Sequence, residues 1–108
     1  MAYQGKLKDK LNDRLFEAIL SLKSIDDCYH FFEDICTVSE LRSLAQRLEV
    51  AKMLEANRTY GEIATKTGAS TATISRVKRC LNYGADGYKL VLNRLADPTP
   101  LKEQKTEE

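Results

Sequence analysis

The chain has no long apolar segment and almost no net charge. None of the apolar runs in its 108 residues approaches the roughly 18 to 20 residues that a membrane-spanning helix requires. Residues 1–14 carry charges with no apolar segment behind them, which is not the pattern of a secretory signal. We therefore expect neither a membrane protein nor a secreted one. The length suits one small domain, or one protomer of an intertwined dimer.

Residues that build catalytic or metal centres are also scarce. The chain has three cysteines at wide spacing, Cys28, Cys36 and Cys80, and a single histidine, His30. This spacing fits no zinc motif, no glycine-rich phosphate loop is present, and no set of nucleophile, base and orienting residue can be assembled. We therefore expect no enzyme and no metal site, and we expect His30 to pack at the edge of an apolar helix face. Three cysteines without a secretion signal favour free thiols in the reducing cytoplasm.

The near-neutral total charge conceals a basic middle segment. Residues 41–83 contain 8 basic and 3 acidic side chains, a net charge of +5, whereas residues 1–40 have a net charge of −3 and residues 84–108 of −1. Such a basic segment is the modest electrostatic footprint that binding to a phosphate backbone requires. A solvated basic face with no partner would give the same pattern.

Apolar residues recur every three or four positions along most of the chain, and no stretch shows the alternation typical of a strand. The fold class is therefore predicted to be all-α. Residues suited to capping a helix precede the apolar stripes, among them the pairs Ser24 with Asp27 and Thr59 with Glu62. The predicted helices cover about 5–23, from Ser24 to Ile35, from a cap at Thr37 or Ser39 to Asn57, 59–66, 71–82 and 86–96.

The predicted helices are too short and too few to form a large core. A chain this small, divided into short helices, buries limited apolar surface by itself, and the first helix has more apolar residues than a surface helix needs. We therefore expect the N-terminal helices to pack against a second copy. Residues 1–97 are predicted to form the helical domain, and the polar tail, 98–108, is not expected to pack. The third helix is expected to bury Leu41, Leu44, Leu48, Ala51 and Leu54.

Residues 60–79, YGEIATKTGASTATISRVKR, meet the steric demands of a helix-turn-helix. The first helix needs a small residue where the second helix crosses it, and Ala64 stands there. The turn needs a residue that tolerates a positive φ angle, and Gly68 follows four residues later. Ile74 and Val77 then provide the inward apolar side of the second helix, and Ile63 that of the first.

The outer surface of this helix-turn-helix, about residues 59–82, is polar and basic. Small side chains at the start of its second helix allow close entry into the major groove of DNA, and hydroxyl groups can bind base edges or phosphates. The basic residues can reach the DNA backbone, and the helix N-termini add N–H donors for phosphates. The predicted DNA-binding residues are Thr59, Lys66, Ser70, Thr71, Ala72, Thr73, Ser75, Arg76, Lys78 and Arg79.

Three stretches, LRSLAQRLEVAKML, TYGEIATKTG and GASTATISRVKRCLNYG, resemble the Trp repressor superfamily, and within it the YerC/YecD branch of TrpR-related proteins. The resemblance covers nearly all of residues 5–95. It implies an all-helical, intertwined homodimer that presents two helix-turn-helix units to a palindromic double-stranded DNA site. The predicted function is therefore that of a sequence-specific regulator of transcription, with repression as the expected direction.

The resemblance also implies where a small effector would bind. In the Trp repressor, tryptophan lies between the third helix and the recognition helix, stacked between two arginines. The matching positions here are Arg47 and Arg76, with Thr37, Thr73 and Cys80 around them. This chain departs from the pattern, because it has Val77 where the repressor has a glycine that makes room for the indole, and Cys80 where it has a serine. We therefore expect DNA binding without tryptophan and no cofactor.

Two other functions stay open from the sequence. One is an amino-acid-responsive repressor with an effector between Arg47 and Arg76, whose planar guanidinium groups can clamp an aromatic ring or a carboxylate. The other is a protein-interaction module that does not bind DNA, which the acidic N-terminal helices favour. The small and basic outer residues of 70–79 weigh against that module, since protein interfaces are richer in aromatic and methionine side chains.

Overall fold

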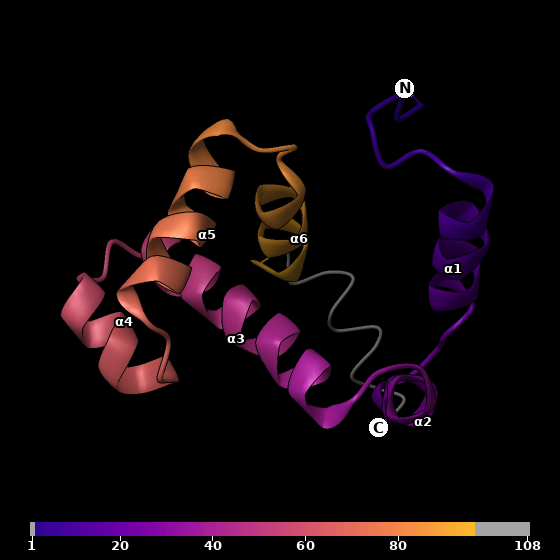
Figure 1. Ribbon diagram of the computed structural model, residues 1–108, viewed down its shortest axis with the longest axis horizontal. Coiled ribbons are helices and arrows are strands. Elements are labelled where there is room, and N and C mark those ends of the chain that lie inside the picture. Colours follow the sequence, from indigo (N-terminus) through magenta and orange to yellow (C-terminus); the bar gives the residue numbers. More distant parts are fainter. Residues whose placement is uncertain (1, 97–108) are drawn as a thin grey trace. The chain divides into compact units, whose positions relative to one another are not determined.

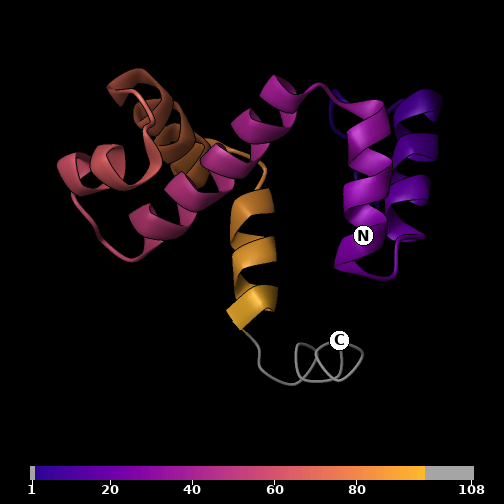
Figure 2. The same ribbon diagram turned by 90° about the horizontal axis from the view of Figure 1, so that it is seen from below.

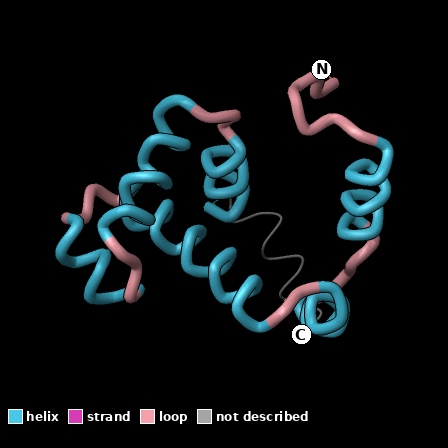
Figure 3. The backbone as a smooth tube through the Cα atoms, in the orientation of Figure 1, coloured by secondary structure: helices cyan, strands magenta, loops and turns pink. Residues whose placement is uncertain are grey.

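The computed structural model describes residues 2–96, and within this range the chain forms six helices and no strand (Figure 1; Figure 3). The all-α prediction is therefore confirmed. No helix of the described part is long and apolar enough to span a bilayer. The predicted polar tail lies outside the described residues. The helices are α1 (Lys10–Leu20), α2 (Ile25–Ile35), α3 (Val38–Glu55), α4 (Tyr60–Thr67), α5 (Thr71–Tyr83) and α6 (Gly87–Ala96).

The chain divides into two compact units, one up to Leu41 and one from Arg42 onward. In the N-terminal unit, α1 begins five residues later than predicted, because the extended residue Asp9 caps it. The Asp9 carboxylate accepts hydrogen bonds from the backbone N–H groups of Leu11 and Asn12, at 3.0 and 3.3 Å. Such a cap satisfies donors that have no partner inside the helix. The apolar stripe that extends before Asp9 in the sequence therefore does not continue the helix.

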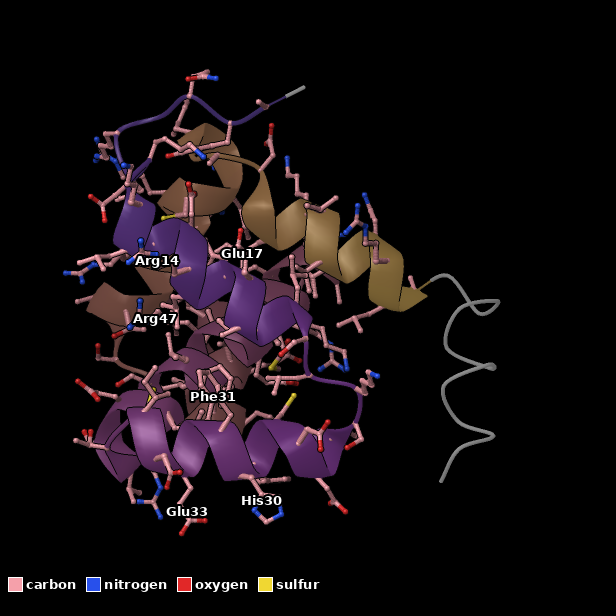
Figure 4. The ribbon with its side chains drawn as sticks, turned by 90° about the vertical axis from the view of Figure 1, so that its right-hand side faces the viewer. Arg14, Glu17, His30, Phe31, Glu33 and Arg47 are labelled. Atoms are coloured by element: carbon pink, nitrogen blue, oxygen red, sulfur yellow. The ribbon has the colours of Figure 1, made fainter. Side chains whose placement is uncertain are left out.

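Helix α2 begins where the sequence predicted, after Ser24. The Ser24 hydroxyl accepts a hydrogen bond from the backbone N–H of Asp27 at 3.0 Å, and the Asp27 carboxylate accepts one from the backbone N–H of Lys23 at 3.0 Å. His30 is exposed and lies on the side of α2 opposite Phe31 (Figure 4), so the expectation that it packs at the edge of the apolar face is wrong.

The apolar faces of the N-terminal unit are largely uncovered. Neither α1 nor α2 contains a buried residue, and Leu11 and Leu20 of α1 are 70% and 83% exposed. Tyr29 and Ile35 of α2 are exposed as well. These side chains are large and apolar, so the unit has surface that favours contact with a further apolar surface.

The C-terminal unit contains the buried core. Helices α4 and α5 lie beside the C-terminal half of α3, and α6 packs against α5 (Figure 1; Figure 2). Fully burying an aliphatic side chain stabilises a fold by about 1.5–3 kcal/mol, so the buried aliphatic residues of this cluster stabilise the unit. Its members are Val50, Ala51, Met53, Ile63, Ala69, Ile74, Val77 and Leu81.

The buried face of α3 differs from the predicted one. Ala51 is buried as expected, but its buried neighbours are Val50 and Met53, whereas Leu44 and Leu48 are 46% and 37% exposed. The C-terminal half of α3 is apolar on more than one side, so periodicity alone leaves several faces possible. The side on which α4 and α5 pack decides which of them is buried.

The turn between α4 and α5 has the predicted geometry. Gly68 has a φ of +75°, and its N–H donates to the carbonyl oxygen of Ala64 at 2.8 Å, which ends α4. Thr59 and Glu62 form the complete capping box at the start of α4, with bonds of 3.1 and 2.9 Å. Asn57, the predicted stop of the third helix, follows α3 and has a φ of +62°.

Replacing Gly68 with Ala should destabilise the protein by about 1–2 kcal/mol, because an L-residue is strained in the left-handed region. A Cβ at Gly68 would meet nothing within 4 Å, so crowding does not contribute. The matched control is Gly87→Ala in α6, where the new Cβ also meets nothing within 4 Å and φ is not positive. Urea unfolding should show a loss for the first variant and none for the second. Equal stability of the two variants would contradict the role assigned to Gly68.

Candidate nucleic-acid interface

Helix α5 has one buried side and one open side. Ile74, Val77 and Leu81 are buried at intervals of three and four residues, which is one face of a helix. The open side carries small and hydroxyl residues near the N-terminus and basic residues further along. Its exposed members from the predicted DNA-binding set are Thr71, Ala72, Ser75, Arg76, Lys78 and Arg79.

The start of α5 is held by Ser70. Its hydroxyl accepts a hydrogen bond from the backbone N–H of Thr73 at 3.1 Å and donates one to the Thr73 hydroxyl at 3.2 Å. Thr73 is half-buried and its hydroxyl is already engaged, so it is less open than Thr71 and Ala72. The first N–H groups of a helix have no partner within it, and an anion can accept hydrogen bonds from them.

Helix α4 contributes the other predicted positions. Thr59 is exposed at its N-terminus, and Lys66 is exposed in its last turn. The Nζ atom of Lys78 lies 5.9 Å from the centre of the Tyr60 ring, at the outer range of a cation–π contact, which connects α5 to the start of α4. No pattern in the sequence marks Tyr60, since only the packing of the two helices brings its ring near Lys78.

The basic residues of this surface carry no acidic partner within residues 2–96. The one ion pair of the described residues joins Lys8 and Asp13 of the N-terminal unit at 3.0 Å. Arg76, Lys78 and Arg79 therefore present unneutralised charge on the open side of α5. Positive charge on a convex helix surface, together with helix N-termini, is the arrangement that binds a phosphate backbone.

Four of the five predicted effector residues lie in the C-terminal unit. Arg47 is exposed on α3, whereas Thr73, Arg76 and Cys80 follow one another at intervals of three and four residues on one face of α5. Thr37 belongs to the N-terminal unit, where it forms a capping box with Glu40 at the start of α3, with bonds of 3.0 and 2.9 Å.

The pKa of the Tyr88 phenol in α6 responds to Arg47 and Cys80, two of the predicted effector residues, and no local pattern in the sequence indicates this. Its half-buried ring packs against the core cluster. Burial raises the pKa of the Tyr88 phenol above its ordinary value of 10.0, the Arg47 guanidinium partly opposes this rise in pKa, and the Cys80 thiol adds to it. The Tyr88 phenol is therefore within electrostatic range of two of the predicted effector residues.

Comparisons with known proteins identify a family. The model of the Trp repressor protein family matches residues 10–96. YerC, an uncharacterised protein of Bacillus subtilis, is 61% identical over 92 residues, which cover 85% of this chain and 88% of YerC. The crystal structure of a TrpR-like protein from Eubacterium eligens is 63% identical, with a TM-score of 0.81 over 85% of this chain and 95% of that one. A candidate Trp repressor from Staphylococcus aureus is 53% identical, with a TM-score of 0.80 over 83% and 90% of the two chains.

Replacing Tyr88 with Phe should remove a tyrosine ionisation above pH 10 from the absorbance titration at 295 nm. The folded pKa exceeds the unfolded value of about 10, so the stability linked to this phenol is complete below that pH. It is lost as the pH rises through the folded pKa. The control is Tyr83→Phe, which removes an exposed phenol and should keep the component above pH 10. Persistence of that component in the Tyr88 variant would contradict the assignment.

Proposed function

The chain belongs to the Trp repressor family, and from this premise we propose that it is a sequence-specific, double-stranded DNA-binding repressor of transcription. Members of this family regulate genes rather than catalyse reactions. The observation that carries the proposal is the division of α5 into a buried side and an open side. Ile74, Val77 and Leu81 anchor the helix in the core, so the opposite side is free to face DNA with small, hydroxyl and basic residues.

The proposed docking uses both helices of the helix-turn-helix. Proteins with this motif, the Trp repressor among them, place the N-terminal part of the second helix in the major groove. Thr71, Ala72 and Ser75 would then lie nearest the base edges, since they are exposed and small. Arg76 and Arg79 would contact the sugar-phosphate backbone, with Thr59, Lys66, Ser70, Thr73 and Lys78 as further contacts.

The proposed regulator does not require tryptophan. Val77 contributes a branched, buried side chain to the core at the position where the family repressor has a glycine that makes room for the indole. Tyr88 packs against the same core. The buried Val77 side chain supports an effector region that the chain fills itself. The alternative, an amino-acid-responsive repressor, draws support from Arg47 and Arg76, which are both exposed.

The proposed regulator is a homodimer, because α1, α2 and α6 have large apolar side chains that the single chain leaves uncovered. Sedimentation equilibrium at micromolar concentration should give about twice the chain mass of 12.2 kDa. Leu11→Glu, which places a charge on the apolar face of α1, should shift the equilibrium toward the monomer. Gln4→Glu makes the same change in formal charge at an exposed polar position and should leave the mass unchanged. A monomer of the unmodified protein would contradict this part of the proposal.

The DNA-binding proposal is tested by selecting genomic fragments with the purified full chain, with and without added tryptophan. Enrichment of one palindromic motif in both conditions is the expected result. Enrichment only with tryptophan would support the amino-acid-responsive alternative, since binding would then depend on the ligand. Absence of any enriched motif would overturn the proposal and favour a module that binds protein.

Arg79→Ala should weaken binding to the selected fragment and to random DNA by similar factors, because a phosphate contact carries no sequence information. The slope of log affinity against log salt should fall by about 0.9, the value for one lost phosphate contact on duplex DNA. Arg94→Ala in α6 removes the same charge outside the proposed surface and is the matched control. An unchanged salt slope for Arg79→Ala would exclude this residue from the interface.

A further inference from the structure

The turn between α4 and α5 is held by side chains as well as by backbone bonds. The Thr67 hydroxyl donates to the carbonyl oxygen of Ile63 at 2.7 Å and accepts from the backbone N–H of Ala69 at 3.1 Å. The backbone N–H of Gly68, the residue before Ala69, donates to the carbonyl oxygen of Ala64 at 2.8 Å. One group of the turn, the carbonyl of Thr67, is left without a partner in its own helix because it belongs to the last turn of α4.

Gln46 of α3 supplies that partner. Its side-chain Nε2 donates a hydrogen bond to the carbonyl oxygen of Thr67 at 3.1 Å, across 21 residues of sequence. Both residues are half-buried and both belong to the C-terminal unit. The peptide group between Thr67 and Gly68 is thereby held on both sides, through its carbonyl by Gln46 and through its N–H by Ala64.

This bond is a directional, polar contact between α3 and the helix-turn-helix. Among the described residues, it is the one hydrogen bond that joins positions more than five residues apart in the sequence. Apolar side chains of the core cluster also join these elements. Apolar contacts are not directional, whereas a hydrogen bond weakens steeply when its angle changes. Gln46 therefore adds a directional restraint to the orientation that the apolar core sets.

A small rotation of the restrained peptide would alter the direction of α5. Gly68 follows it directly, and glycine adopts many backbone conformations at little cost. Helix α5 begins three residues later, at Thr71. A rotation of the Thr67–Gly68 peptide would therefore change the direction in which α5 leaves the turn.

We propose that Gln46 is a positioning residue for DNA recognition, which fixes the orientation of α5 relative to α3 through the Thr67 carbonyl. This inference rests on the proposed DNA-binding function and extends it. The bond joins two groups of the protein itself, so α5 is oriented without any bound small molecule. Gln46 touches no DNA in this mechanism and acts only through the turn.

Two variants of the full chain test the proposal. Gln46→Met keeps the length and apolar stem of the side chain and removes the donor. Gln46→Glu keeps its shape, but a carboxylate accepts hydrogen bonds and repels the Thr67 carbonyl oxygen. Gln4→Glu is the control for the added negative charge, because Gln4 is exposed and makes no side-chain hydrogen bond within the described residues.

The measurements are affinities for the palindromic fragment obtained by genomic selection and for a random duplex of equal length. Both Gln46 variants should bind the palindromic fragment about tenfold more weakly, which corresponds to ~1.4 kcal/mol, and the random duplex with much less change. Hydrogen exchange should become faster at the N–H groups of Gly68 and Ala69 in both variants, and stay unchanged at those of Val77 and Leu81.

Each contrary result has a distinct meaning. Unchanged affinity of both Gln46 variants for the palindromic fragment would overturn the proposal, as would equal losses on the two duplexes, since a purely structural role lowers both. A normal affinity of Gln46→Glu beside a weakened Gln46→Met would assign the effect to packing rather than to the donor, and would also overturn it. If the unmodified protein binds neither duplex, the DNA-binding function itself fails, and this inference fails with it.

Discussion

The packing of α4 and α5 against the C-terminal half of α3 is the interaction on which the candidate interface depends. Ile63, Ile74 and Val77 are buried in one cluster with Val50 and Ala51 of α3, because a single helix leaves its own side chains exposed to solvent. This burial holds the short helix α4, which at eight residues would not be stable alone. It also fixes which side of α5 faces outward, and therefore which residues can meet DNA.

The basic side chains on the open side of α5 form no ion pairs with the rest of the described chain. The basic residues of α5 have no acidic partner in the described part of the chain, and Lys78 meets only the face of the Tyr60 ring. A surface that neutralised these charges internally would gain little stability, because exposed ion pairs contribute about 0–1 kcal/mol. In the proposed function these unpaired side chains contact DNA phosphates, and the counterions that such contacts release favour binding.

Local signals explain why much of the fold was predictable. Thr59 and Glu62 close their capping box as predicted, and Thr37 with Glu40 proves to be the cap of the third helix, one of the two that the sequence offered; each box involves residues three apart in sequence. Gly68 adopts the positive φ that the turn requires. The predictions failed where a local signal was absent or ambiguous. The first helix begins only after Asp9, and Leu44 and Leu48 of α3 remain partly exposed because the helix offers more than one apolar side.

The sequence by itself determined the helices, their caps, the turn at Gly68 and the family, because these depend on residues close together along the chain. Only the tertiary structure decided which face of α3 is buried, that the Gln46 amide meets the Thr67 carbonyl, and that Tyr88 of α6 packs against the core cluster. Each of these contacts joins residues from different helices. Their meeting depends on crossing angles and helix rotations that side-chain packing selects, and periodicity along one helix does not contain that information.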